Sequence, residues 1–119
     1  MKQHGAYITI NTKSGLKTAM INFSDYDSNK IFEEEDIDVV CKYITQFSHI
    51  SNRTFTFYSL NSKDNGFNCK AFAQYMGGDG NTIEAEFYVP YVYGRDPLEY
   101  FHILLSEWVH NNSTMVNNG

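Results

Sequence analysis

The sequence predicts a single α+β domain in which two helices pack on an antiparallel sheet of about five strands, in the order ββ-α-βββ-α. The chain has 119 residues, is 42% hydrophobic and contains nine Phe, nine Tyr and one Trp, which is enough to build one core. Several segments alternate apolar and polar side chains, as strands do. Short turns link the strand segments, and this favours antiparallel pairing, because parallel pairing needs a long crossover.

The strand segments are set apart by their alternation and by the turns that bound them. They are residues 6–12, 16–23, 53–60, 67–76 and 82–93. In the last segment the apolar residues from Ile83 to Tyr93 share one face, and the residues that point the other way are Glu84, Glu86, Tyr88 and Pro90. We expect Pro90 to lie at an edge or a bulge, because proline has no N–H for the sheet.

Two helices are predicted from apolar spacing and from helix-start signals. The first follows residue 33, because one apolar stripe recurs at positions i, i+3, i+4, i+7 and i+10 in Ile37, Val40, Cys41, Ile44 and Phe47. The second begins at Asp96, with proline at the next position. Its buried stripe consists of Leu98, Phe101, Leu105, Trp108 and Val109. We expect the domain to span residues 1–110 and residues 111–119 to form a flexible C-terminal tail.

The two cysteines are expected to be buried free thiols. Cys41 belongs to the first predicted helix and Cys69 to the fourth predicted strand, with no second ligand at zinc spacing around either. No apolar run is long enough to span a membrane. The start of the chain lacks the apolar core of a signal peptide, so we expect a cytoplasmic protein. Abundant Asn and scarce Pro are typical of an AT-rich bacterial or phage gene.

Charge is concentrated in one segment, which we call the acidic segment (residues 25–38). It holds seven of the fourteen acidic residues and one base, Lys30, so its net charge is −6 within a chain of net charge −5. Such a patch attracts the basic surface of another macromolecule, and it repels phosphate, which argues against direct binding of nucleic acid.

These features predict a non-enzymatic binding module that docks on a basic protein without a cofactor. A plausible role is that of an inhibitor or DNA mimic, whose carboxylates replace phosphates in a nuclease or a nucleic-acid-binding protein. Aromatic side chains within the segment would act as anchors. The candidate partner-binding residues are Asp25, Tyr26, Asp27, Phe32, Glu33, Glu34, Glu35, Asp36 and Asp38.

Calcium binding is a second hypothesis, because the acidic segment is similar to an EF-hand loop. The candidate ligands are Asp25, Asp27, Asn29, Ile31 through its carbonyl, and Asp36. Three features differ from that pattern. Lys30 stands where glycine makes the sharp turn, Asp replaces the closing Glu, and a strand precedes the loop.

A small enzyme is a third hypothesis. It would use polar residues on the last helix, where His102 and Ser106 are four positions apart. The sequence offers no third group to orient them, so we expect no catalysis. It does not indicate an oligomeric state.

Overall fold

The computed structural model describes residues 2–3, 7–12, 15–23, 25–34, 36–64 and 66–117. Within these residues the chain forms one seven-stranded sheet and three helices. The strands, in sheet order, are β1 (Lys2–Gln3), β2 (Ile8–Asn11), β3 (Lys17–Asn22), β4 (Val39–Ser48), β5 (Arg53–Ser62), β7 (Glu84–Pro90) and β6 (Asp79–Gly80). The helices are α1 (Ser28–Glu34), α2 (Cys69–Tyr75) and α3 (Pro97–Asn117). The α+β class is therefore confirmed.

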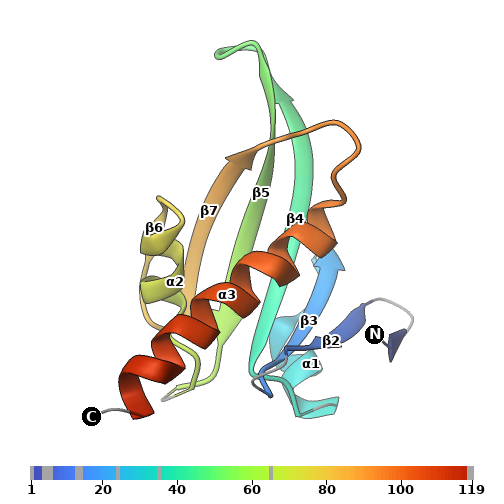
Figure 1. Cartoon of the computed structure of the whole chain (residues 1–119). Coiled ribbons are helices and arrows are strands. Elements are labelled where there is room, and N and C mark those ends of the chain that lie inside the picture. Colours follow the sequence, from blue (N-terminus) through green and yellow to red (C-terminus); the bar gives the residue numbers. More distant parts are fainter. Residues whose placement is uncertain are drawn as a thin grey trace.

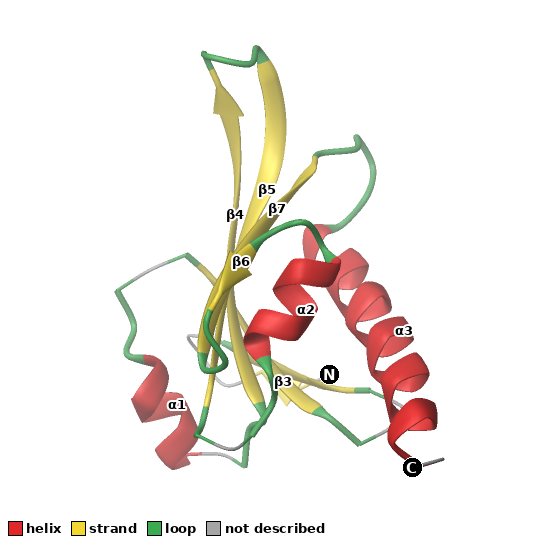
Figure 2. Ribbon diagram, turned by 90° about the vertical axis from the view of Figure 1, so that its left-hand side faces the viewer, coloured by secondary structure: helices red, strands yellow, loops and turns green. Residues whose placement is uncertain are grey.

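The helices cover the two faces of the sheet unequally. α3 runs diagonally across one face, with α2 beside it, and the β4–β5 hairpin extends beyond the body of the molecule (Figure 1). Seen along the sheet, α1 lies on the other side and only near the lower end (Figure 2). The upper part of that second face is not covered by any element in the described ranges.

The sheet is mixed, and the prediction of an all-antiparallel sheet is wrong in this respect. β3 and β4 are parallel, with Ala19 opposite Val40 and Ile21 opposite Lys42, whereas the other neighbouring strands are antiparallel. The connection between them contains α1. The acidic segment thus supplies the crossover that parallel pairing requires, instead of the start of a long helix.

The predicted helix after residue 33 is also wrong, because Val39–Ser48 forms strand β4. Val39 and Cys41 face the core beneath α2 and α3, while Val40 faces the smaller core beneath α1. A central strand that is buried on both faces carries apolar residues without a period of two. The apolar residues that resembled one helical stripe therefore belong to both faces of strand β4.

The segment predicted as a fourth strand contains helix α2 instead. Asn68 caps it, because its side-chain oxygen accepts a hydrogen bond from the Ala71 N–H at 3.0 Å. Gly77 follows the helix with a φ of +89°, a conformation that suits glycine at a helix end. Cys69 is thus helical and Cys41 lies in a strand, the reverse of our expectation. Both thiols are nevertheless free and buried, as predicted.

The larger core lies between the sheet and α3, with Tyr58 at its centre. The Tyr58 ring stacks on Phe87 and on Phe101, with centroids 5.1 and 5.2 Å away. Phe101 and Leu105 are fully buried, which confirms the apolar stripe predicted for the last helix. That helix begins where predicted and continues to Asn117, beyond residue 110, where the C-terminal tail is predicted to begin.

Candidate functional site

The turn before α1 is organised by one of the predicted site residues, Asp27. Its carboxylate accepts a hydrogen bond from the Asn29 N–H at 2.9 Å, and its carbonyl accepts one from the Lys30 N–H at 3.1 Å. These bonds cap the first turn of the helix. Ile31 is completely buried and anchors α1 to the sheet. The sheet face that carries α1 is otherwise uncovered by the described elements, and we call it the open face. The loop that carries Asp25 and Asp27 is held against the lower end of this face.

A hollow of about 500 Å³ lies between this loop and the sheet, and we call it the α1 hollow. The Lys42 ammonium donates to the Tyr26 carbonyl at 2.6 Å, and the Ser28 hydroxyl donates to the Asn61 side chain at 3.3 Å, so the loop is tied to β4 and β5. The lining residues are Asp25, Tyr26, Asp27, Ser28, Asn29, Phe32, Lys42, Asn61, Ser62, Ile83 and Glu84. Three carboxylates and one ammonium line the hollow.

A second hollow of about 530 Å³, the β7 hollow, shares Glu84 with the first. Sheet register explains its composition. Ser59 of β5 lies opposite Glu86 of β7, and Glu86 lies opposite Asp79 of β6. Paired residues point to the same face, so these side chains form a row that crosses the strands. The two hollows together carry five exposed carboxylates, which we call the acidic row: Asp25, Asp27, Asp79, Glu84 and Glu86.

An aromatic band lies directly above the acidic row on the same open face. The register places Ile44, Phe57 and Tyr88 side by side across β4, β5 and β7. The row above them contains Phe55 and Pro90, which are also opposite each other. The Phe23 ring lies 6.1 Å from Phe57, and the Phe55 ring lies 5.3 Å from Tyr88. The aromatic band consists of Phe23, Ile44, Phe55, Phe57, Tyr88 and Pro90.

Much of this apolar surface is open to solvent. Tyr88 is 66% exposed and Phe23 is 48% exposed, while the remaining members are half-buried or exposed. Exposed apolar patches that are bordered by polar or charged residues are typical of sites that bind another molecule. The aromatic band and the acidic row together have this character.

The structure brings together only part of the predicted partner-binding set. Asp25, Tyr26, Asp27 and Phe32 line the α1 hollow. Tyr26 and Phe32 also pack against the core beneath α1, and Lys63 lies over the Phe32 ring at 5.6 Å, so neither is a free anchor.

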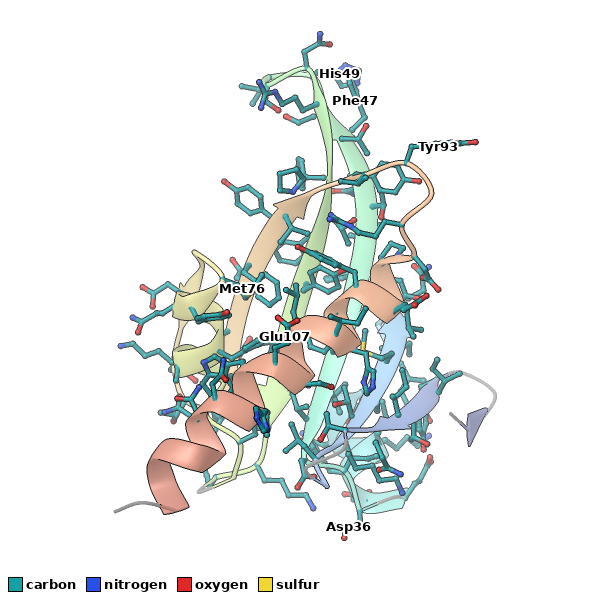
Figure 3. All side chains as sticks on the ribbon, viewed as in Figure 1. Asp36, Phe47, His49, Met76, Tyr93 and Glu107 are labelled. Atoms are coloured by element: carbon teal, nitrogen blue, oxygen red, sulfur yellow. The ribbon has the colours of Figure 1, made fainter. Side chains whose placement is uncertain are left out.

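Of the other predicted residues that the structure describes, Glu33 and Glu34 belong to α1 and Asp36 and Asp38 follow it, and these four do not line either hollow. The Glu34 carboxylate accepts a hydrogen bond from the Tyr7 hydroxyl at 3.2 Å, and the Asp38 carboxylate accepts one from the Lys17 N–H at 2.7 Å. Glu34 and Asp38 do not share a helix face, because α1 ends at Glu34. Glu33 and Asp36 are exposed, and Asp36 lies at the opposite end of the molecule from Phe47 and His49 (Figure 3). Glu35 falls outside the described residues.

The candidate calcium ligands do not adopt the course of an EF-hand loop. Residues 28–34 are helical, Ile31 lies in the middle of that helix, and Asp36 follows its far end. In the part of the chain that the structure describes, no three His, Cys, Asp or Glu residues gather at metal-binding distance.

Several residues of the site could not be identified as such from the sequence. The alternation in residues 82–93 correctly put Glu84, Glu86 and Tyr88 on one face, but it did not show what lies beside them. The sequence did not single out Asn61 or Asp79, because strand pairing brings Asn61 beside Ser28 and Glu84 and brings Asp79 beside Glu86.

The two polar residues considered for catalysis, His102 and Ser106, both lie on α3. His102 and Ser106 are half-buried on the helix, and burial lowers the pKa of the His102 imidazole. No hydrogen bond between these two side chains is seen. Burial also raises the pKa of the Cys41 thiol well above its usual value, which keeps it in the unreactive protonated form.

The sequence matches no protein-family model, and no curated protein is significantly similar to it. Among the described residues, no helix combines the length and apolarity that crossing a membrane requires. The geometry of the open face is therefore the basis for a functional proposal.

Proposed function

We propose that this protein is a non-catalytic binding module that docks on a basic protein through its open sheet face. The observation that carries this proposal is the meeting of two acidic groups that are far apart in the sequence. Asp25 and Asp27 precede α1, whereas Glu84 and Glu86 belong to β7, and adjoining hollows unite them. Among the described residues that line these hollows Lys42 is the one base, and its ammonium donates a hydrogen bond to the Tyr26 carbonyl.

Charge and apolar surface on this face have complementary roles. The acidic row raises the rate of encounter with a positively charged partner and selects its orientation. The aromatic band supplies the desolvated contacts that hold a complex together, since tyrosine and other aromatic side chains dominate binding energy at protein interfaces.

The partner class follows from the same chemistry. Surfaces that bind nucleic acid are rich in Lys and Arg, and a row of carboxylates can occupy them as phosphates do. We therefore expect the partner to be a nuclease or another nucleic-acid-binding protein that this module antagonises. Direct binding of nucleic acid is disfavoured, because the acidic row repels phosphate.

A charge-reversal experiment tests the proposal. The variant Asp27→Lys/Glu84→Lys/Glu86→Lys and the wild-type protein are immobilised, and proteins captured from a cell extract are compared at low and high salt. We expect the wild type to retain basic proteins that elute with salt, and the variant to lose them. The captured proteins are then assayed for nuclease activity with and without added module.

The matched control is Asp64→Lys/Glu99→Lys/Glu107→Lys, which changes the net charge equally at exposed positions outside both hollows. It should keep the partners. Equal retention by the two variants would refute docking through this face. A third variant, Glu33→Lys/Asp36→Lys, asks whether the exposed acids at and beyond the end of α1 take part, and we expect at most a small effect.

A further inference from the structure

We propose that the partner contributes an amphipathic helix, about three turns long with Lys or Arg along one flank, which lies across the strands on the aromatic band. This inference rests on the proposed function and specifies the element that docks. It follows from the dimensions of the band, from the position of the acidic row beside it, and from the way the opposite face of the same sheet is covered.

The dimensions of the aromatic band suit a helix. From Phe23 at the end of β3 to Tyr88 on β7 the band crosses three strand spacings, which is about 14 Å at 4.8 Å for each spacing. Its two rows are two residues apart along the strands, which is about 7 Å. A helix is about 10 Å wide and rises 1.5 Å per residue, so ten to twelve residues would cover the band.

The direction of the band disfavours docking of a peptide as an added strand. An extended segment would have to add to a free strand edge, and the edge beside the band is the upper part of β7. Pro90 has no N–H there, and its carbonyl already accepts a hydrogen bond from the Arg95 guanidinium at 2.7 Å. The apolar rows also run across the strands, whereas an added strand would run along them.

The position of the acidic row sets the charge of the docked helix. Glu86 lies two residues from Tyr88 along β7, and Asp79 lies beside Glu86. The same row also contains Ser59 and Lys42, so its two carboxylates adjoin the β7 end of one long side of the band. A helix lying on the band would hold its apolar stripe against Phe57 and its neighbours and would present the adjacent flank to the acids, where Lys or Arg is favoured.

The opposite face shows that this sheet accepts a helix in this way. α3 crosses that face (Figure 1), and its Phe101 ring stacks on Tyr58 and on Phe87. A second copy of this chain is a poorer occupant of the open face, because two acidic rows would be brought together. A lipid or nucleic-acid surface is disfavoured for the same reason, since both present phosphate.

The test uses a synthetic helix as the probe. A 14-residue acetylated peptide carries Leu along one stripe and Lys along one flank, and its binding is measured by fluorescence anisotropy at low and high salt. Two control peptides keep the length, one with Glu in place of Lys and one with a central Pro that breaks the helix. We expect both controls to bind at least tenfold more weakly than the probe.

Protein variants locate the contact. Tyr88→Ser and Phe23→Ser remove exposed rings from the band and should each weaken binding at least fivefold. Tyr93→Ser removes a ring that is 93% exposed outside the band, and it should change binding less than twofold. Circular dichroism and thermal unfolding confirm that each variant is folded, and two independent ring deletions keep the test valid if one of them is not.

Different failures have different meanings. If binding responds to Glu84→Lys but not to Tyr88→Ser or Phe23→Ser, the acidic docking surface stands and the helix proposal is refuted. Equal binding of the Pro-containing peptide would also refute it. If light scattering shows a dimer that Tyr88→Ser dissociates, the occupant is a second copy and the proposal falls. If the triple variant Asp27→Lys/Glu84→Lys/Glu86→Lys retains captured basic proteins as well as its matched control does, the proposed function itself fails.

Discussion

Replacing Tyr58 by phenylalanine tests how the sheet holds α3 in place. The Tyr58 side chain is completely buried, and its hydroxyl donates a hydrogen bond to the Pro97 carbonyl in the first turn of α3 at 2.6 Å. Burial is the main cause that raises the pKa of this phenol, so the group stays protonated and acts as a donor at ordinary pH. The substitution removes this one bond and keeps the three ring contacts, which are with Tyr43, Phe87 and Phe101.

The size of the effect follows from what is left behind. An intramolecular hydrogen bond makes a net contribution of about 1 kcal/mol to the free energy of unfolding. The Pro97 carbonyl still faces the N–H four residues along the helix, so no unsatisfied acceptor remains to add a penalty. We expect Tyr58→Phe to cost about 1 kcal/mol, and Tyr58→Ala, which also leaves a cavity, to cost about 3–5 kcal/mol.

Urea denaturation followed by circular dichroism measures both values. With a slope near 1.5 kcal/mol/M, the midpoint for Tyr58→Phe should fall by roughly 0.7 M without a change in slope. Affinity for the peptide probe should stay the same, because Tyr58 faces away from the aromatic band. A midpoint shift below 0.2 M would show that the hydroxyl does not tie β5 to α3. A cost of Tyr58→Phe as large as that of Tyr58→Ala would show that the ring itself is not seated as described.

Three further substitutions test other parts of the structure. Asn68→Ala should cost about 1 kcal/mol of unfolding free energy in urea titrations because α2 loses its cap, and Asn68→Asp should restore most of it. An alanine Cβ at position 78 would clash with the Glu86 carbonyl oxygen, so Gly78→Ala should lower the melting temperature strongly. Gly77→Ala should lower it far less, because its new Cβ meets nothing within 4 Å and costs only backbone strain of about 1 kcal/mol. Equal losses would contradict the close approach of the segment after α2 to β7. Burial raises the pKa of the Cys41 thiol in the folded state, so its contribution to stability is complete below the unfolded pKa near 9 and is lost as the pH rises above that value. Cys41→Ala should therefore flatten the fall in stability between pH 8 and 10. An unchanged pH profile would contradict this assignment.

The sequence indicated the elements whose packing is simple. Residues 82–93 have one face against the core and one in solvent, and their alternation correctly placed Glu84, Glu86 and Tyr88 outward. The last helix was marked by Asp96, whose carboxylate accepts a hydrogen bond from the Leu98 N–H at 3.0 Å. In these segments local chemistry and tertiary packing favour the same structure, so pattern alone was sufficient.

The sequence patterns predicted the wrong secondary structure for two elements, one buried on both sides and one short. β4 is central in the sheet and lies between two cores at its lower end, so Val39, Val40 and Cys41 are all buried and the alternation disappears. In α2, seven residues offer only two helical turns of evidence, and the odd-numbered apolar residues happened to imitate a strand. The packing of α2 against α3 and β7 stabilises the helix over the strand.

For the site, the sequence by itself determined that negative charge gathers in residues 25–38, and that acidic and aromatic side chains alternate outward on β7. Only the tertiary structure decided which of these charges act together. Parallel pairing of β3 with β4 folds the acidic segment back under the sheet, and the register of β5 with β7 sets Glu84 beside Asn61 and Glu86 beside Ser59. Strand register is a contact between residues distant along the chain, and no local pattern encodes it. For this reason the acidic segment contributes Asp25 and Asp27 to a larger surface, while its remaining described carboxylates lie outside the two hollows.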